Sequence, residues 1–132
     1  MKGFKSNIEK DTLKNTNFRD VIYTGKYLQL VLMSLKIGED IGEEIHKNND
    51  QFFRFEGGTG KCIIDDNEYQ VKDGDAIIVP AGAKHNVINV DSKKALKMYT
   101  IYALPHHEDG IVSTTKKYAE SSSEHFDGKT TE

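Results

Sequence analysis

The chain of 132 residues contains no tryptophan, one cysteine and two prolines. A single cysteine, Cys62, excludes an internal disulfide and any metal cluster built from cysteines alone. The most apolar stretch, residues 27–35, is far shorter than the ~20 residues that a membrane-spanning helix needs. The N-terminus also lacks the apolar segment of a secretory signal. We therefore expect a cytoplasmic protein that does not associate with membranes.

Basic residues are not in excess: 18 Lys and Arg face 21 Asp and Glu, a formal net charge of −3. Because nucleic-acid phosphates require clustered positive charge, we expect no nucleic-acid partner. Five histidines are present, so a metal site would have to combine histidine nitrogens with oxygen ligands. The length is typical of one domain.

Short strands separated by turn residues are predicted from residue 27 to residue 104. They cover residues 27–35, 44–46, 51–55, 61–64, 68–71, 76–79, 85–89 and 96–104, with a hairpin signal at Asp65-Asp66-Asn67. Without a long helical period, this pattern favours an antiparallel barrel or sandwich. Ser113-Thr114-Thr115 followed by a polar segment predicts a short C-terminal helix. We divide the chain into an N-terminal arm and strands (1–27), a barrel core (28–104) and a C-terminal loop, short helix and polar tail (105–132).

The most informative stretch runs from residue 74 to residue 89. It has the spacing Gly-x5-Pro-x-Gly-x2-His-x3-Asn, with the fixed positions occupied by Gly74, Pro80, Gly82, His85 and Asn89. Proline and glycine shape tight turns through a fixed and a permissive φ respectively. His85 then opens the following strand, where its imidazole can point into the interior.

A second pattern lies upstream and begins at Gly38. It places Glu44 and His46 two residues apart, followed by Gln51 and a closing Gly58. Residues two apart on a strand project from the same face of the sheet. Glu44 and His46 are therefore expected to point in one direction.

The two patterns together resemble the paired motifs of small single-domain cupins, over roughly residues 28–103. The upstream motif departs from the family twice, because Glu44 stands at the first histidine position and Gln51 at the glutamate position. The local sequences around residues 51 and 99 are similar to those of a bacterial subgroup described as mannose-6-phosphate isomerase-like. The resemblance implies an all-β fold, the cupin double-stranded β-helix or jelly-roll barrel. It also implies a homodimer, for which residues 5–21 are a candidate pairing segment.

The resemblance further implies one divalent metal ion inside the barrel. Glu44, His46 and His85 would hold it, with Gln51 either as a fourth ligand or hydrogen-bonded to a metal-bound water. Two histidines and one carboxylate suit non-haem Fe(II) and catalytic Zn. Mixed nitrogen and oxygen ligands also accept Mn, Co, Ni or Cu, so the residues do not select the metal.

Two classes of function remain open on these grounds. The first is a metal-dependent enzyme, isomerase-like or dioxygenase-like, that acts on a small polar molecule in the cavity. The alternative is a non-catalytic cupin that binds a sugar or another small molecule. No residue is assigned as catalytic, because the motifs contain no evident base for proton transfer. Phe53 and Tyr99 are predicted to line the interior and contact the small molecule, whereas His106 and His107 are predicted to lie at the surface.

Overall fold

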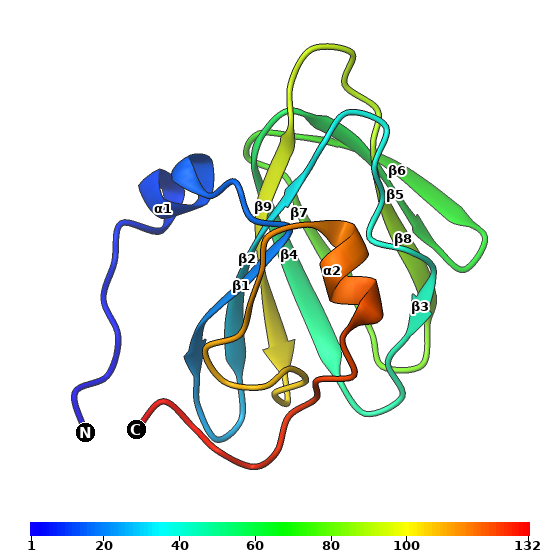
Figure 1. Ribbon diagram of the computed structural model, residues 1–132. Coiled ribbons are helices and arrows are strands. Elements are labelled where there is room, and N and C mark those ends of the chain that lie inside the picture. The colour runs from blue at the N-terminus through cyan, green and yellow to red at the C-terminus, as the bar shows by residue number, and fades with distance from the viewer.

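The computed structural model describes residues 1–132 as two facing antiparallel sheets with a short helix near each end of the chain (Figure 1). One sheet contains β1 (Arg19–Thr24), β2 (Gln29–Leu35), β4 (Asp50–Gly57), β7 (Ala76–Val79), β9 (Leu96–Ala103) and β10 (Val112–Ser113). The other contains β3 (Glu44–Ile45), β5 (Thr59–Ile64), β6 (Asn67–Lys72) and β8 (Lys84–Asn89). Their spatial orders are β10-β1-β2-β9-β4-β7 and β3-β8-β5-β6. The predicted fold class, mostly β with two sheets, is confirmed.

The hydrophobic core lies between the two sheets and follows from strand alternation. Along β9 the buried residues alternate with more exposed ones, so that Leu96, Met98, Thr100 and Tyr102 face inward. β4 contributes Phe53 and Phe55, both fully buried, from the neighbouring strand. Fully burying such a side chain stabilises a fold by roughly 1.5–3 kcal/mol. This inward set holds the sheets together and forms the floor beneath the site described below.

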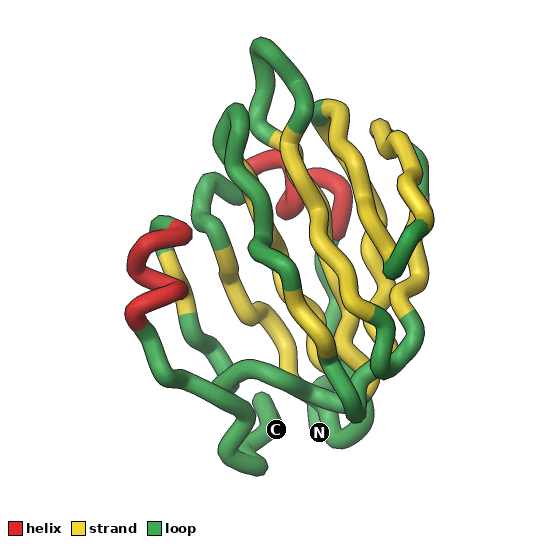
Figure 2. The backbone as a smooth tube through the Cα atoms, turned by 90° about the vertical axis from the view of Figure 1, so that its right-hand side faces the viewer, coloured by secondary structure: helices red, strands yellow, loops and turns green.

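The two helices occupy separate places on the sheets (Figure 2). α1 (Ile8–Lys14) packs against β2, β4 and β9, and α2 (Lys116–Ser121) packs against β10. α2 begins at Thr115, whose side chain accepts a hydrogen bond from the Tyr118 N–H, as the sequence predicts for a capped C-terminal helix. Neither helix has the length and apolar character that crossing a membrane requires.

The N-terminal segment forms a helix and a strand that pack within the same chain. Residues 8–14 form α1, which Asn7 caps by accepting a hydrogen bond from the Lys10 N–H at 3.1 Å. β1 pairs with β2 along its length and with β10 at Arg19 and Asp20. Part of residues 5–21, the segment expected to pair across a dimer, is thus helical in the single chain, and its pairing with a second copy stays a prediction. Homodimer formation stays a prediction, which sedimentation at micromolar concentration measures directly.

The upstream glycine pattern is explained by a close approach at Gly58. Gly58 has φ +82, and a Cβ placed on it would lie 2.4 Å from the carbonyl oxygen of Ala95. Gly38 has a similar φ of +79 but has no atom within 4 Å of such a Cβ. Alanine at Gly38 would therefore introduce backbone strain alone, whereas alanine at Gly58 would add a steric overlap with Ala95.

We expect Gly58→Ala to destabilise the protein more than Gly38→Ala. The Gly38 substitution should cost about 1 kcal/mol, because alanine disfavours a positive φ. The Gly58 substitution should cost a further 1–3 kcal/mol or so, because the backbone at Ala95 has to move. Urea unfolding of both variants measures this difference, and equal losses would show that the contact with Ala95 carries no strain.

Candidate metal centre

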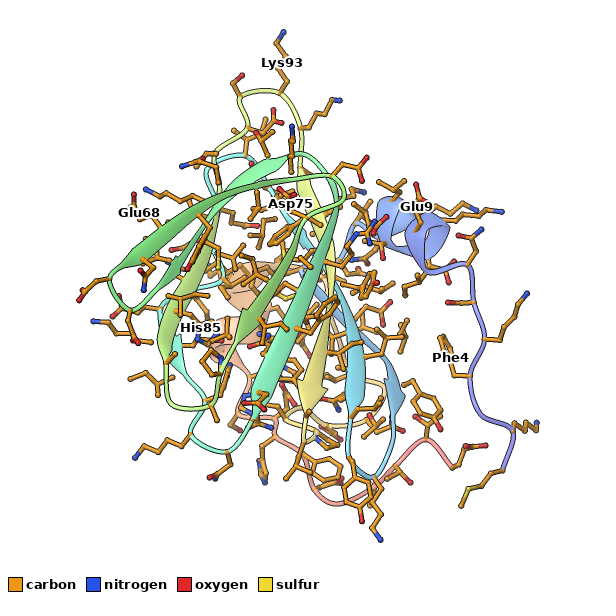
Figure 3. The ribbon with its side chains drawn as sticks, turned by 180° about the vertical axis from the view of Figure 1, so that it is seen from behind. Phe4, Glu9, Glu68, Asp75, His85 and Lys93 are labelled. Atoms are coloured by element: carbon orange, nitrogen blue, oxygen red, sulfur yellow. The ribbon has the colours of Figure 1, made fainter.

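The pairing of β3 with β8 brings the two sequence patterns together. Glu44 is the register partner of His85, and His46 follows directly after β3. One ligand atom from each of Glu44, His46 and His85 lies within 4.8 Å of the other two. Figure 3 shows His85 toward one end of the sheets and Lys93 beyond the other end. The structure thus brings the predicted carboxylate of Glu44 and the predicted imidazoles of His46 and His85 together.

The hydrogen bond of His85 fixes which of its ring nitrogens is available. His85 Nδ1 lies 3.1 Å from the carbonyl oxygen of Ala83, which can only accept, so Nδ1 carries the proton. Nε2 therefore carries the lone pair, and it is buried without any hydrogen-bond partner. Burial lowers the pKa of His85, which keeps the ring neutral. A neutral imidazole held at Nδ1 by a carbonyl is the usual arrangement of a metal-binding histidine.

Glu44 and His46 form the second half of the cluster. Glu44 Oε2 lies 3.0 Å from His46 Nε2, and the glutamate side chain is 31% exposed while the histidine is buried. Burial raises the pKa of Glu44, but the hydrogen bond from His46 and the charge of Arg19 outweigh it and lower the pKa. Glu44 is therefore a carboxylate at neutral pH and is reached by solvent.

Gln51 lies within the interior, on the strand that carries the core phenylalanines. It pairs in register with Tyr102, and its Nε2 donates a hydrogen bond to Thr100 Oγ1 at 2.9 Å. Its other polar atom, Oε1, is buried without a partner. A buried acceptor without a donor costs about 1–3 kcal/mol. Both predicted alternatives, a metal and a metal-bound water, would satisfy this oxygen.

These residues fit a divalent cation. A carboxylate and two imidazoles supply three ligands, with His85 Nε2 and Gln51 Oε1 both lacking partners inside the protein. Two histidines and one carboxylate leave coordination positions open for a substrate.

Three further residues surround this cluster, although sequence reasoning placed none of them there. The ring of His106 lies 4.4 Å from the ring of His46, and the ring of Tyr102 lies 5.6 Å from it. His107 is only 5% exposed. The prediction that His106 and His107 lie at the surface is wrong, because the chain after β9 turns back toward the cluster.

A chain of hydrogen bonds connects the C-terminal segment to Tyr102. Glu124 Oε1 lies 2.6 Å from His107 Nδ1, and His107 Nε2 lies 3.2 Å from the Tyr102 hydroxyl. Burial raises the pKa of Glu124, but hydrogen bonds from His107 and the Glu108 N–H outweigh it and keep it a carboxylate. A carboxylate accepts, so His107 Nδ1 donates and Nε2 accepts from Tyr102. The hydroxyl proton of Tyr102 is thus directed toward His107, and its oxygen remains an acceptor.

The two predicted substrate-contacting aromatics lie differently. Phe53 is interior, as predicted, and its ring stacks on Phe55 at 6.3 Å. Tyr99 faces outward, where its ring lies 6.3 Å from that of Phe52. The interior position predicted for Tyr99 is wrong, because the inward face of β9 carries Thr100 and Tyr102 instead. Contact of Phe53 with a small molecule stays a prediction.

A cavity of about 210 Å³ borders the cluster on the side of Glu44. Its lining residues come from β1, from the chain at and before β3, and from the chain at and around α2, which lies in front of the sheets in Figure 1. Its lining is mostly polar and consists of Phe18, Arg19, Ile41, Glu44, His107, Ala119, Glu120, Ser122 and Glu124. A larger hollow of about 620 Å³ lies near Gly57 and Lys97, at the other end of β4 from Gln51, and contains no histidine. The cavity of about 210 Å³ thus borders the cluster at Glu44, and a further one of about 160 Å³ borders it at His85.

Acid should destabilise the metal-free protein before its carboxylates titrate. Burial and the charges of His107 and His46 lower the pKa of His106 to about 4, from an ordinary value of 6.5. The unfolded chain thus binds the extra proton more readily, and stability falls as pH drops from about 6.5 toward 4. His106 alone should remove about 2 kcal/mol by pH 5. Urea unfolding of chelator-treated protein at pH 7 and pH 5 measures this loss, which His106→Gln should reduce.

Comparison with known proteins identifies relatives over most of the chain. The family model described as "Cupin domain" matches residues 31–102. The uncharacterised protein YrkC of Bacillus subtilis (strain 168) is 50% identical over 121 residues, 87% of this chain, and the chain spans 64% of that relative's length. An uncharacterised protein of Acanthamoeba polyphaga mimivirus is 42% identical over 113 residues, covering 83% of this chain and 71% of that protein. The crystal structure of BH2720 from Bacillus halodurans matches with a TM-score of 0.90 and 42% identity, over 92% of this chain and 96% of that chain.

Proposed function

The chain belongs to the cupin-domain family, and from this we propose that it is a metal-dependent enzyme acting on a small polar molecule. The observation that carries the proposal is the convergence of Glu44, His46 and His85 within 4.8 Å of one another. The partnerless Nε2 of His85 supports a metal rather than a hydrogen-bonded packing role. A divalent ion bound there would supply Lewis acidity toward a substrate oxygen.

Among the reactions open to such a site, we propose isomerase-like proton transfer. Proton transfer needs a base beside the metal, and the motifs themselves contain none. His106 meets this need, since its ring lies 4.4 Å from that of His46 and no hydrogen bond holds either of its ring nitrogens. Its lowered pKa leaves the imidazole neutral at pH 7, in the state that accepts a proton.

The polar surroundings favour this chemistry over a dioxygenase-like reaction on an apolar substrate. The phenylalanines that would have made an apolar pocket, Phe53 and Phe55, are fully buried in the core. The cavity beside Glu44 is lined instead by charged and polar side chains such as Arg19 and Glu124. Within this proposal Tyr102 positions the substrate, because its oxygen is an acceptor for a substrate hydroxyl. The mannose-6-phosphate isomerase-like subgroup agrees with this reaction type and stays a prediction.

Hydrogen exchange in heavy water tests the proposal. Metal-loaded protein should catalyse exchange of a C–H proton for deuterium in some member of a panel of small hydroxy acids and sugars, read by NMR. His106→Gln should slow this exchange by about 100-fold, since a positioned base contributes about 10²–10⁴-fold. His125→Gln, which changes an exposed histidine of the tail, should leave it unchanged. Oxygen consumption without exchange would establish the dioxygenase-like reaction instead, and binding without turnover the non-catalytic alternative.

A further inference from the structure

Arg19 points into the interior of the protein, which is unusual for a charged residue. It is the register partner of Met33 on β2 and of Ser113 on β10, and both partners are buried. Because register partners project from the same face of a sheet, the Arg19 side chain enters the space between the sheets. Val21, two residues further along β1, lies in the hydrophobic core on the same face.

The guanidinium of Arg19 lies over the ring of Phe18, 5.4 Å from its centre, but has no hydrogen-bond partner at Nε. Its Nε is buried and makes no hydrogen bond, and no carboxylate oxygen lies within 4.0 Å of its nitrogens. A buried charged donor left unsatisfied is costly, and arginine offers a planar fork that matches a carboxylate with two hydrogen bonds.

The glutamates that share the cavity with Arg19 are already engaged. Glu124 accepts hydrogen bonds from His107 and from the Glu108 N–H. Glu120 is exposed and pairs with Lys116 at 3.6 Å. Glu44 belongs to the proposed metal centre. Arg19 thus forms no ion pair within 4.0 Å with any of these glutamates, although its charge contributes to lowering the pKa of Glu44 and of Glu124.

We propose that Arg19 binds the carboxylate of a small organic acid, whose remaining polar group reaches the metal held partly by Glu44. This assignment rests on the proposed function and names the substrate class of the same site. Arg19 and Glu44 both line the cavity of about 210 Å³, which is below the roughly 300–1,000 Å³ of pockets for drug-sized ligands. The occupant is therefore small.

A carboxylate fits this cavity better than a phosphate does. Arg19 is the only cationic side chain in the lining, beside three glutamates. A doubly charged phosphate would need a second cation to offset those carboxylates, whereas a singly charged carboxylate is matched by one guanidinium.

Calorimetric binding of lactate and its neutral amide, lactamide, tests the assignment. The two probes share a hydroxyl for the metal and differ in the charge offered to Arg19. Protein of measured metal content should bind lactate about tenfold or more tightly than lactamide. Arg19→Gln should abolish this preference without changing the metal content. Arg54→Gln, which alters the arginine paired with Glu56 on β4, should keep the preference.

Each other result has a defined meaning. Equal lactate binding by wild type and Arg19→Gln, or no lactate binding by the wild type, would overturn the assignment while a bound metal leaves the proposed function standing. Tighter binding of inorganic phosphate than of lactate would overturn the carboxylate class. If the wild type holds no metal, the proposed function fails. Lactate binding that still depends on Arg19 would then support the anion site, and its absence would overturn it.

Discussion

Replacing Glu44 and His46 together by alanine is expected to abolish stoichiometric metal binding. The double substitution removes the only carboxylate and one of the two imidazoles whose ligand atoms lie within 4.8 Å of one another. His85 and the neutral Gln51 would remain, and one imidazole with one amide oxygen falls short of the three protein ligands that catalytic metal sites use. Elemental analysis of dialysed protein measures the loss.

Two further variants are measured beside the double variant: a control at an exposed histidine and a substitution at Gln51. His125→Ala removes an exposed histidine of the tail and should leave the metal content unchanged. Gln51→Ala should weaken metal binding if its Oε1 is a ligand, and should leave it near the wild-type level if that oxygen only contacts a metal-bound water. Stoichiometric metal in the Glu44→Ala, His46→Ala double variant would contradict the proposed centre.

Replacing Glu124 by alanine is expected to destabilise the protein by about 3–5 kcal/mol, because two hydrogen bonds to a charged acceptor are lost and each contributes about 1.5–3 kcal/mol. The Glu124 and His107 side chains are only 8% and 7% exposed, with 2.6 Å between Oε1 and Nδ1. Without the carboxylate, a buried imidazole N–H and the Glu108 N–H both lose their acceptor. The hydroxyl of Tyr102 would also lose its fixed direction, because His107 could then turn or exchange its tautomer.

Urea unfolding of the Glu124→Ala variant measures the destabilisation, and amide hydrogen exchange locates it. Protection should fall in residues 104–126, which return over the end of the sheets. Glu120→Ala serves as the control, because this glutamate is exposed and pairs only with Lys116. It should cost less than about 1 kcal/mol, as exposed ion pairs usually do. Equal effects of the two substitutions would show that the hydrogen-bond chain contributes nothing to stability.

The sequence was most informative where local spacing determines structure. Fixed intervals of glycine, proline and histidine carried the resemblance to cupins, and that resemblance implied the convergence of Glu44, His46 and His85 that the structure shows. The hairpin at Asp65, where φ is 48, and the capped helix α2 followed from the same local rules.

Residues brought in by long-range contacts could not be predicted in this way. His106 and His107 follow Pro105 in a segment without periodicity, and nothing local indicates that it turns back onto His46. Arg19 faces inward because β1 pairs with β2 and β10, a pairing that depends on the whole sheet. Tyr102 could have been predicted locally. Assigning the even-numbered residues of β9 to the interior would have placed Tyr102, rather than Tyr99, on the inward face.

The central claim is that one metal ion sits between Glu44, His46 and His85. An anomalous difference map from metal-soaked crystals tests it most directly. We predict a single strong peak at about 2.0–2.2 Å from a Glu44 oxygen, a His46 nitrogen and His85 Nε2, the distances typical of such ligands. A map without a peak there, or with its strongest peak at other residues, would contradict the account.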